Sequence, residues 1–165
     1  MSNLLREFTF EKPPKEITYL DNEPLKLTKE FVFFHNKSKF RKELNRLQYL
    51  FKSYTRIPLK AEGIRDSYLK EELSETFFMV LFTTSDIVKK TNKILKNYSD
   101  QEFESGCFLI EATSNYLLLL TKEIDSLISG INLLEEILIQ ILEDYINQQN
   151  FDEYIKIRPF KLKSC

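Results

Sequence analysis

The chain is poor in the residues that make turns and in those that bind metals. Among its 165 residues are three Gly, five Pro, two Cys, one His and no Trp. Four of the five Pro come before residue 59, so the second half has few turn formers. Because an all-β chain needs a turn signal every ~8–12 residues, this composition favours a mainly α fold.

The same shortages exclude several kinds of site. One His, His35, and two Cys, Cys107 and Cys165, cannot supply four zinc ligands from these residue types. The sequence also contains no Gly-rich phosphate loop, and no Ser–His–Asp set can be assembled. We therefore expect no catalytic residue, no metal, no cofactor and no enzymatic activity, and we expect Cys107 to be a small core residue.

Long apolar runs are missing as well. The longest, "FFMVLF" at residues 77–82, falls far short of the ~18 residues that indicate a membrane span. The N-terminal residues "MSNLLREFTFEK" lack the apolar region of a signal peptide. With 42% hydrophobic and 30% charged residues, the chain is expected to be globular, without a membrane span, and intracellular, in the cytoplasm.

Changes in composition divide the chain into three parts. Residues 1–37 alternate apolar and polar positions in short pieces and contain Pro13, Pro14 and Pro24, which predicts an extended arm, with short strands, packed on the body. Residues 38–150 form a helical bundle in this interpretation. Residues 151–165 are a basic C-terminal tail, which could be an edge strand, a docking peptide or a segment held against the chain's own body.

Three helices are predicted from apolar spacing. Residues 38–56 carry an apolar stripe that includes Leu47, Phe51 and Tyr54. Residues 65–98 have apolar positions seven residues apart. A third helix over 100–148 is indicated by a heptad pattern that misses its apolar residue only at Gly106 and Thr113 and continues unshifted through Gly130. The apolar heptad positions are Phe103, Ile110, Leu117, Leu120, Ile124, Leu127, Ile131, Leu134, Leu138, Ile141 and Tyr145.

These helices define the expected fold class. It is mainly α, an elongated antiparallel helical bundle built on a long helical hairpin, with an extended N-terminal arm. The second helix is shorter than the third, so it leaves the end of the third helix uncovered. That end, "INLLEEILIQILEDYI" at residues 131–146, has ten apolar residues in sixteen.

The uncovered helix end leads to a prediction of function. We expect self-association through Leu134, Leu138, Ile141 and Tyr145, because buried Leu and Ile side chains each stabilise by about 1.5–3 kcal/mol. The expected partner is a second copy of the chain or another helical protein. The predicted function is a non-catalytic protein–protein interaction or assembly subunit that uses long amphipathic helices.

A nucleic-acid-associated helical protein is the alternative. Residues 37–60 carry one acid, Glu43, and eight basic residues that could track phosphates: Lys37, Lys39, Arg41, Lys42, Arg46, Lys52, Arg56 and Lys60. Residues 121–153, in contrast, carry eight acids and one base. Opposite blocks of this kind also predict that the two helices pair with each other within the chain.

Overall fold

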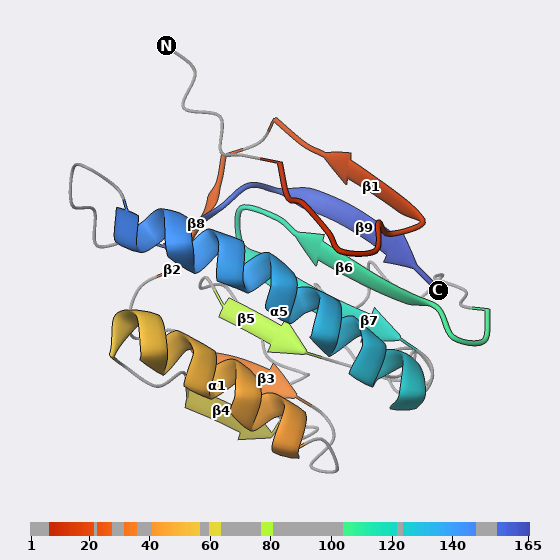
Figure 1. Cartoon of the computed structure of the whole chain (residues 1–165), viewed down its shortest axis with the longest axis horizontal. Coiled ribbons are helices and arrows are strands. Elements are labelled where there is room, and N and C mark those ends of the chain that lie inside the picture. The colour runs from red at the N-terminus through yellow and green to blue at the C-terminus, as the bar shows by residue number, and fades with distance from the viewer. Residues whose placement is uncertain are drawn as a thin grey trace.

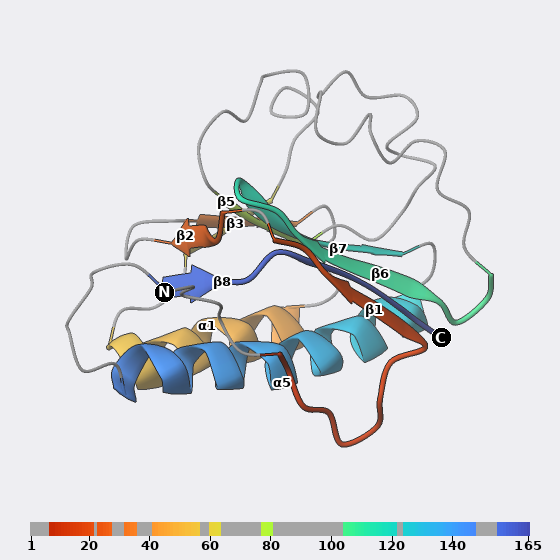
Figure 2. The ribbon, with the colours of Figure 1, turned by 90° about the horizontal axis from the view of Figure 1, so that it is seen from above.

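A computed structural model describes residues 7–21, 23–27, 32–35, 41–56, 60–63, 77–80, 104–121, 124–147 and 155–165. In this part of the chain, a mixed sheet carries two helices on one face, and a two-stranded sheet lies beside it (Figures 1 and 2). The elements are β1 (Glu16–Tyr19), β2 (Leu25–Leu27), β3 (Val32–His35), α1 (Arg41–Thr55), β4 (Lys60–Gly63), β5 (Phe77–Val80), β6 (Phe108–Ala112), β7 (Tyr116–Thr121), α5 (Ile124–Asn147), β8 (Ile155–Ile157) and β9 (Phe160–Ser164).

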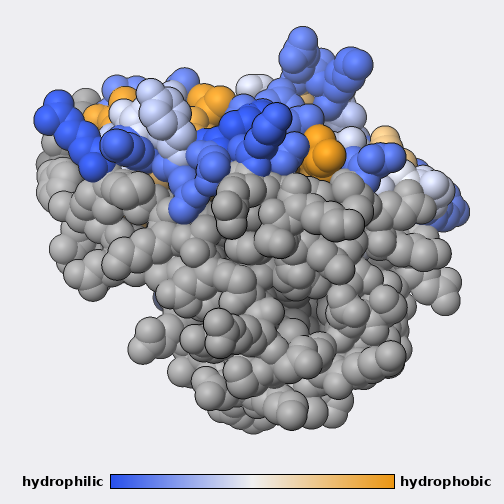
Figure 3. Space-filling model, turned by 90° about the horizontal axis from the view of Figure 1, so that it is seen from below, coloured by the Kyte–Doolittle hydropathy of each residue, from blue (hydrophilic) through white to orange (hydrophobic). Residues whose placement is uncertain are grey.

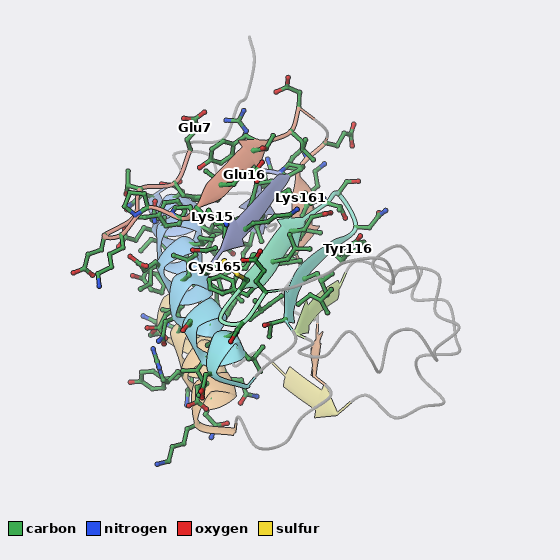
Figure 4. All side chains as sticks on the ribbon, turned by 90° about the vertical axis from the view of Figure 1, so that its right-hand side faces the viewer. Glu7, Lys15, Glu16, Tyr116, Lys161 and Cys165 are labelled. Atoms are coloured by element: carbon green, nitrogen blue, oxygen red, sulfur yellow. A yellow bond between two sulfur atoms is a disulfide. The ribbon has the colours of Figure 1, made fainter. Side chains whose placement is uncertain are left out.

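The large sheet has seven strands in the order β1-β9-β6-β7-β5-β3-β4. The four strands from β7 to β4 are parallel, and those from β1 to β7 are antiparallel. Both helices cover the same face, as the side view in Figure 4 shows, and they run side by side in the same direction (Figure 1). Strands β2 and β8 form the small sheet near the C-terminal end of α5.

Strand β7 explains why the middle of the sheet is so apolar. Its sequence YLLLLT is buried at every position. Leu117 and Leu119 join the core under the helices, whereas Leu118 and Leu120 point to the other face and are also fully buried. A strand covered on both faces needs a continuous apolar run rather than alternation.

The expected fold class is wrong, because the described chain is rich in strands and has two helices, not an elongated helical bundle or a coiled coil. Residues 104–121, predicted as helix, form the β6–β7 hairpin, and Phe77–Val80, within the predicted second helix, is a strand. Four consecutive leucines satisfy a heptad pattern and a buried strand equally well, so periodicity could not separate the two. The other residues of the second helix lie outside the described residues.

The two positions where the heptad pattern failed are the two turns. Gly106 has a φ of 83°, in the left-handed region that favours glycine, and Cys107 N donates to Glu104 O at 3.1 Å to close the turn. Thr113 Oγ1 accepts from the backbone nitrogens of Asn115, at 3.1 Å, and Tyr116, at 3.2 Å. A hydroxyl that caps backbone donors in this way favours a turn over a helix.

The predicted helix at 38–56 is present as α1, with Leu47 and Phe51 buried. Helix α5 also passes through Gly130 without a break, as its unshifted register predicted. A Cβ at Gly130 would lie 2.6 Å from Leu119 Cδ1 and 3.3 Å from Phe108 Cδ2. The absence of a side chain therefore lets the helix approach β6 and β7 closely.

The two ends of the described chain pair with each other. Strand β1 pairs with β9, with Ile17 opposite Leu162, and β2 pairs with β8. Strand β9 also pairs with β6, so it is an interior strand and not an edge strand. In the part of the chain that the structure describes, no helix is both long and apolar enough to cross a membrane.

A disulfide joins Cys107 and Cys165, whereas the sequence had indicated a thiol in the core. Cys107 directly precedes Phe108 and Cys165 directly follows Ser164, so the bridge lies just beyond the Phe108–Ser164 pair at the end of the β6–β9 ladder. The bridge therefore ties the far end of β9 to the turn before β6.

Replacing both cysteines with serine should lower the free energy of unfolding. For a separation of 58 residues, the lost loop constraint corresponds to about 4 kcal/mol. Denaturant unfolding measures the change, and dithiothreitol should bring the unaltered protein to the stability of the variant without affecting the variant. Equal midpoints before and after reduction would show that the bridge does not constrain the chain.

Gly130→Val should destabilise the protein by about 2 kcal/mol, because the added methyl groups meet Leu119 and overpack the contact between helix and sheet. The exposed neighbour Ser129 provides the control, since Ser129→Val adds the same side chain without a clash and should change stability by about 0.5 kcal/mol or less. Thermal unfolding of both variants compares the two. A Gly130→Val protein as stable as the control would mean that the helix does not approach the sheet this closely.

Candidate interaction surface

The apolar face of α5 is covered by the chain itself. Leu134 and Leu138 are fully buried, Ile141 is 5% exposed, and Tyr145 is partly buried against the same core. The cover comes from β6, β7 and α1, and from β8 near the C-terminal end of the helix. These four residues belong to the chain's own core, and self-association through them remains a prediction.

The outer surface of the two helices, which we call the helix layer, is strongly charged on α1. Lys42, Lys52 and Arg56 are exposed, and Arg46 meets Glu135 of α5. Of the other predicted basic residues, Arg41 begins α1 and Lys60 begins β4, whereas Lys37 and Lys39 lie outside the described residues.

The Arg46–Glu135 contact is a two-pronged ion pair. Arg46 Nε donates to Glu135 Oε2 at 3.2 Å, and Nη2 donates to Oε1 at 3.0 Å. The pair joins the basic helix α1 to the acidic helix α5. The opposite charges of residues 37–60 and 121–153 had predicted that these two helices pair with each other. Since the Arg46 side chain is 48% exposed, the pair contributes more to the relative placement of the helices than to stability.

Helix α5 brings the opposite charge to the helix layer. It has no basic residue in its last turn, and Asp125 and Glu143 are exposed along it. Ile146 near its end is 52% exposed, and Tyr49 on α1 is 70% exposed. Figure 3, a view from the α1 side, shows that the described edge of the helix layer is mainly hydrophilic, with separate apolar patches.

Residues 7–11 lie along the far flank of α5. The side-chain amide of Gln140 binds both backbone groups of Thr9. Its Oε1 accepts from Thr9 N at 2.8 Å, and its Nε2 donates to Thr9 O at 2.7 Å. Glu11 N donates to Glu136 Oε1 at 3.3 Å. Phe8 anchors the segment by packing edge-on against Phe160. Residues 7–11 therefore cover the flank of α5 that faces away from α1. The part of the helix layer toward α1 is not covered by this segment.

Tyr19 links that segment to the sheet. Its hydroxyl oxygen accepts from Phe8 N at 2.8 Å, and the Arg158 guanidinium lies 4.9 Å above its ring. Burial raises the pKa of Tyr19 above its ordinary value of 10.0, although the hydrogen bond from Phe8 opposes the shift. The phenol is therefore protonated at neutral pH and serves as a structural contact.

The sequence did not predict two features of the structure. Among the aromatics of the basic helix, Phe51 and Tyr54 face the core as expected, but Tyr49 faces solvent. Its position, two residues from Leu47 and therefore about 200° round the helix, was the available signal. The disulfide had no signal, because its pairing depends on the register of β6 and β9. Within the described ranges, no cluster of three or more His, Cys, Asp or Glu side chains could hold a metal ion.

No protein-family model matches the chain, and no curated protein matches its sequence. Its fold is similar to that of several solved structures. CpGH84D has a TM-score of 0.62 at 15% identity, covering 96% of this chain and 24% of that one. The GH20 exo β-N-acetylglucosaminidase from Vibrio harveyi, in complex with N-acetylglucosamine, has a TM-score of 0.57 at 6% identity, covering 99% and 20%.

The β-N-acetylhexosaminidase from Bacteroides fragilis is a third example, with a TM-score of 0.52 at 11% identity, covering 93% of this chain and 24% of that one. The chain thus spans about a fifth to a quarter of these structures. At these identities the likeness shows a shared fold.

The expectation that the chain has no enzymatic activity is contradicted by these likenesses. It rested on the absence of a catalytic constellation from the sequence, and the structures that share the fold are glycoside hydrolases. A motif search could not find this relation, because the shared feature is the arrangement of strands and helices at 6–15% identity.

Leu138→Asp should unfold the protein or destabilise it by about 4 kcal/mol or more, since it places an unpaired charge in the core. Asn132→Asp introduces the same side chain at an exposed position of α5, and it should change stability by about 0.5 kcal/mol or less. Circular dichroism during thermal unfolding measures both. If Leu138→Asp melts like Asn132→Asp, the apolar face of α5 is not covered by this chain.

Proposed function

We propose that this chain is an interaction module that associates with a glycoside hydrolase acting on carbohydrate that contains N-acetylglucosamine. The observation that carries the proposal is the asymmetry of the structural match. The solved hydrolases cover 92–99% of this chain, whereas the chain covers 20–25% of each of them. The fold unit in this chain thus corresponds to one part of a larger hydrolase.

The assembly role is supported by the helix layer. Large exposed apolar side chains are uncommon in the described chain, and both Tyr49 and Ile146 lie on these two helices. Tyrosine is enriched at the centres of protein interfaces, and fixed charges around such a centre favour particular partners. A helical protein or a second copy of the chain fits this surface.

The compartment is part of the proposal. A cytoplasmic location was expected from the sequence, but the Cys107–Cys165 disulfide counts against it, because such bonds persist mainly in oxidising compartments. We place the functional protein in an oxidising environment on this ground.

The proposal is tested by isolating the tagged chain from its native cell and assaying hydrolysis of 4-nitrophenyl N-acetyl-β-D-glucosaminide. Activity should elute together with the chain at a mass well above the 19.7 kDa of one chain. The purified chain alone is assayed in parallel, so that activity of the chain itself is told apart from activity that a partner brings.

The matched control is an unrelated tagged protein isolated in the same way, which should bring down no activity. An isolate of the chain without hydrolase activity on this substrate would contradict the link to these enzymes. Hydrolysis by the purified chain alone would keep that link and contradict the need for a partner in the activity.

A further inference from the structure

The two helices of the helix layer carry opposite charges on surfaces that face the same way. The exposed residues Lys42 and Lys52 of α1, and Arg56 directly after its last residue, are basic. Residues 124–147, which form α5, include no Lys or Arg, and one of the exposed acids of the helix, Glu143, lies close to its C-terminus. A helix C-terminus already carries a partial negative charge, so an acid there is unfavourable unless a cation lies nearby.

The same surface holds the exposed large apolar residues of the described chain. Tyr49 is 70% exposed and Ile146 is 52% exposed. On the opposite face of the sheet, in contrast, Leu109, Leu118 and Leu120 are fully buried. The helix layer is thus the described surface that combines exposed apolar side chains with both signs of charge.

The Arg46–Glu135 pair fixes how far each residue lies along the layer. Because α1 and α5 run in the same direction (Figure 1), positions along both can be counted from that contact. Lys52 lies six residues beyond Arg46, and Glu143 lies eight beyond Glu135, or about 9 and 12 Å at 1.5 Å per residue. The cation and the acid are therefore at nearly the same level.

Consider a two-fold axis that runs parallel to the helices on the outer surface of the helix layer. Rotation about this axis leaves the position of each residue along the helices unchanged and exchanges the lateral positions of α1 and α5. It places α1 of one copy over α5 of the other, so Lys52 and Arg56 meet Glu143 of the second copy, and Tyr49 comes against its α5. Such an interface is self-complementary, and every contact occurs twice. The added cations also compensate the C-terminus of α5, which no basic residue of its own last turn does.

We infer that the helix layer is a homodimer interface, with the basic stripe Lys42, Lys52 and Arg56 of each copy facing the acidic surface of α5 in the other, and Tyr49 at its centre. This inference rests on the assembly part of the proposed function and names its partner. It does not depend on the association with a hydrolase, which is measured by activity rather than by mass. The core residues Leu134 and Leu138 take no part in it.

Light scattering after size-exclusion chromatography tests the inference on the full chain. At about 100 µM in low salt, the unaltered protein should have twice the 19.7 kDa mass of one chain, and added salt should weaken the dimer, because salt screens exposed charges. Lys52→Glu and Glu143→Lys should each weaken dimerisation about tenfold, because like charges then face each other twice. The double variant Lys52→Glu with Glu143→Lys restores opposite charges and should recover the dimer.

The matched control is Ser114→Asp, which changes charge at an exposed position in the β6–β7 turn and should leave the dimer intact. Circular dichroism confirms that each variant is folded. A monomeric unaltered protein, or a dimer insensitive to Lys52→Glu, Glu143→Lys and Tyr49→Asp, would overturn the inference. A monomer that shifts duplex DNA in a gel, in a salt-sensitive manner lost with Lys52→Glu, would assign the basic stripe to nucleic acid instead and would equally overturn it.

Discussion

The contact between α5 and the β6–β7 hairpin is the constraint around which the described fold is arranged. The helix lies close to the strands because Gly130 has no side chain, and a Cβ at this position would collide with Leu119 of β7. Once the helix lies there, its apolar stripe is covered on the sheet side, and α1 and β8 complete the cover. The remaining outer surface of the two helices is then mainly polar, with Tyr49 and Ile146 exposed on it, and this surface is the part of the helices that is available to partners.

The second requirement is the pairing of segments that are distant in sequence. Strand β9 lies between β1 and β6, and β8 pairs with β2, so residues near both ends of the described chain share two sheets. This arrangement turns two stretches that look like an arm and a tail into structural parts of the body. The disulfide lies at the end of the β6–β9 ladder, next to the last paired residues of the two strands.

The sequence was informative where local spacing decides the structure. Helix α1 and the uninterrupted course of α5 through Gly130 followed from apolar periodicity, and the opposite charges of the two helices predicted a pair of the kind formed by Arg46 and Glu135. The prediction was wrong for the β6–β7 hairpin. A strand buried on both faces has a continuous apolar run, and such a run also satisfies the apolar spacing of a helix. On the candidate surface, the sequence predicted the basic residues of α1, and the angle of about 200° between Leu47 and Tyr49 was a signal for the exposure of Tyr49. The disulfide, in contrast, depends on the register of β6 and β9, which is a property of the tertiary structure.

The interior position of β9 has a consequence for the order in which the protein can fold during synthesis. Among the described elements β1 is made first and β9 last, yet β1 has no other partner in the sheet than β9. The hairpin and α5 can therefore assemble as the chain emerges, while one edge of β6 and the whole of β1 wait. Because closing so long a loop is slow, the ribosome-bound intermediate carries an open strand edge, which is the kind of surface that chaperones protect and that aggregation exploits.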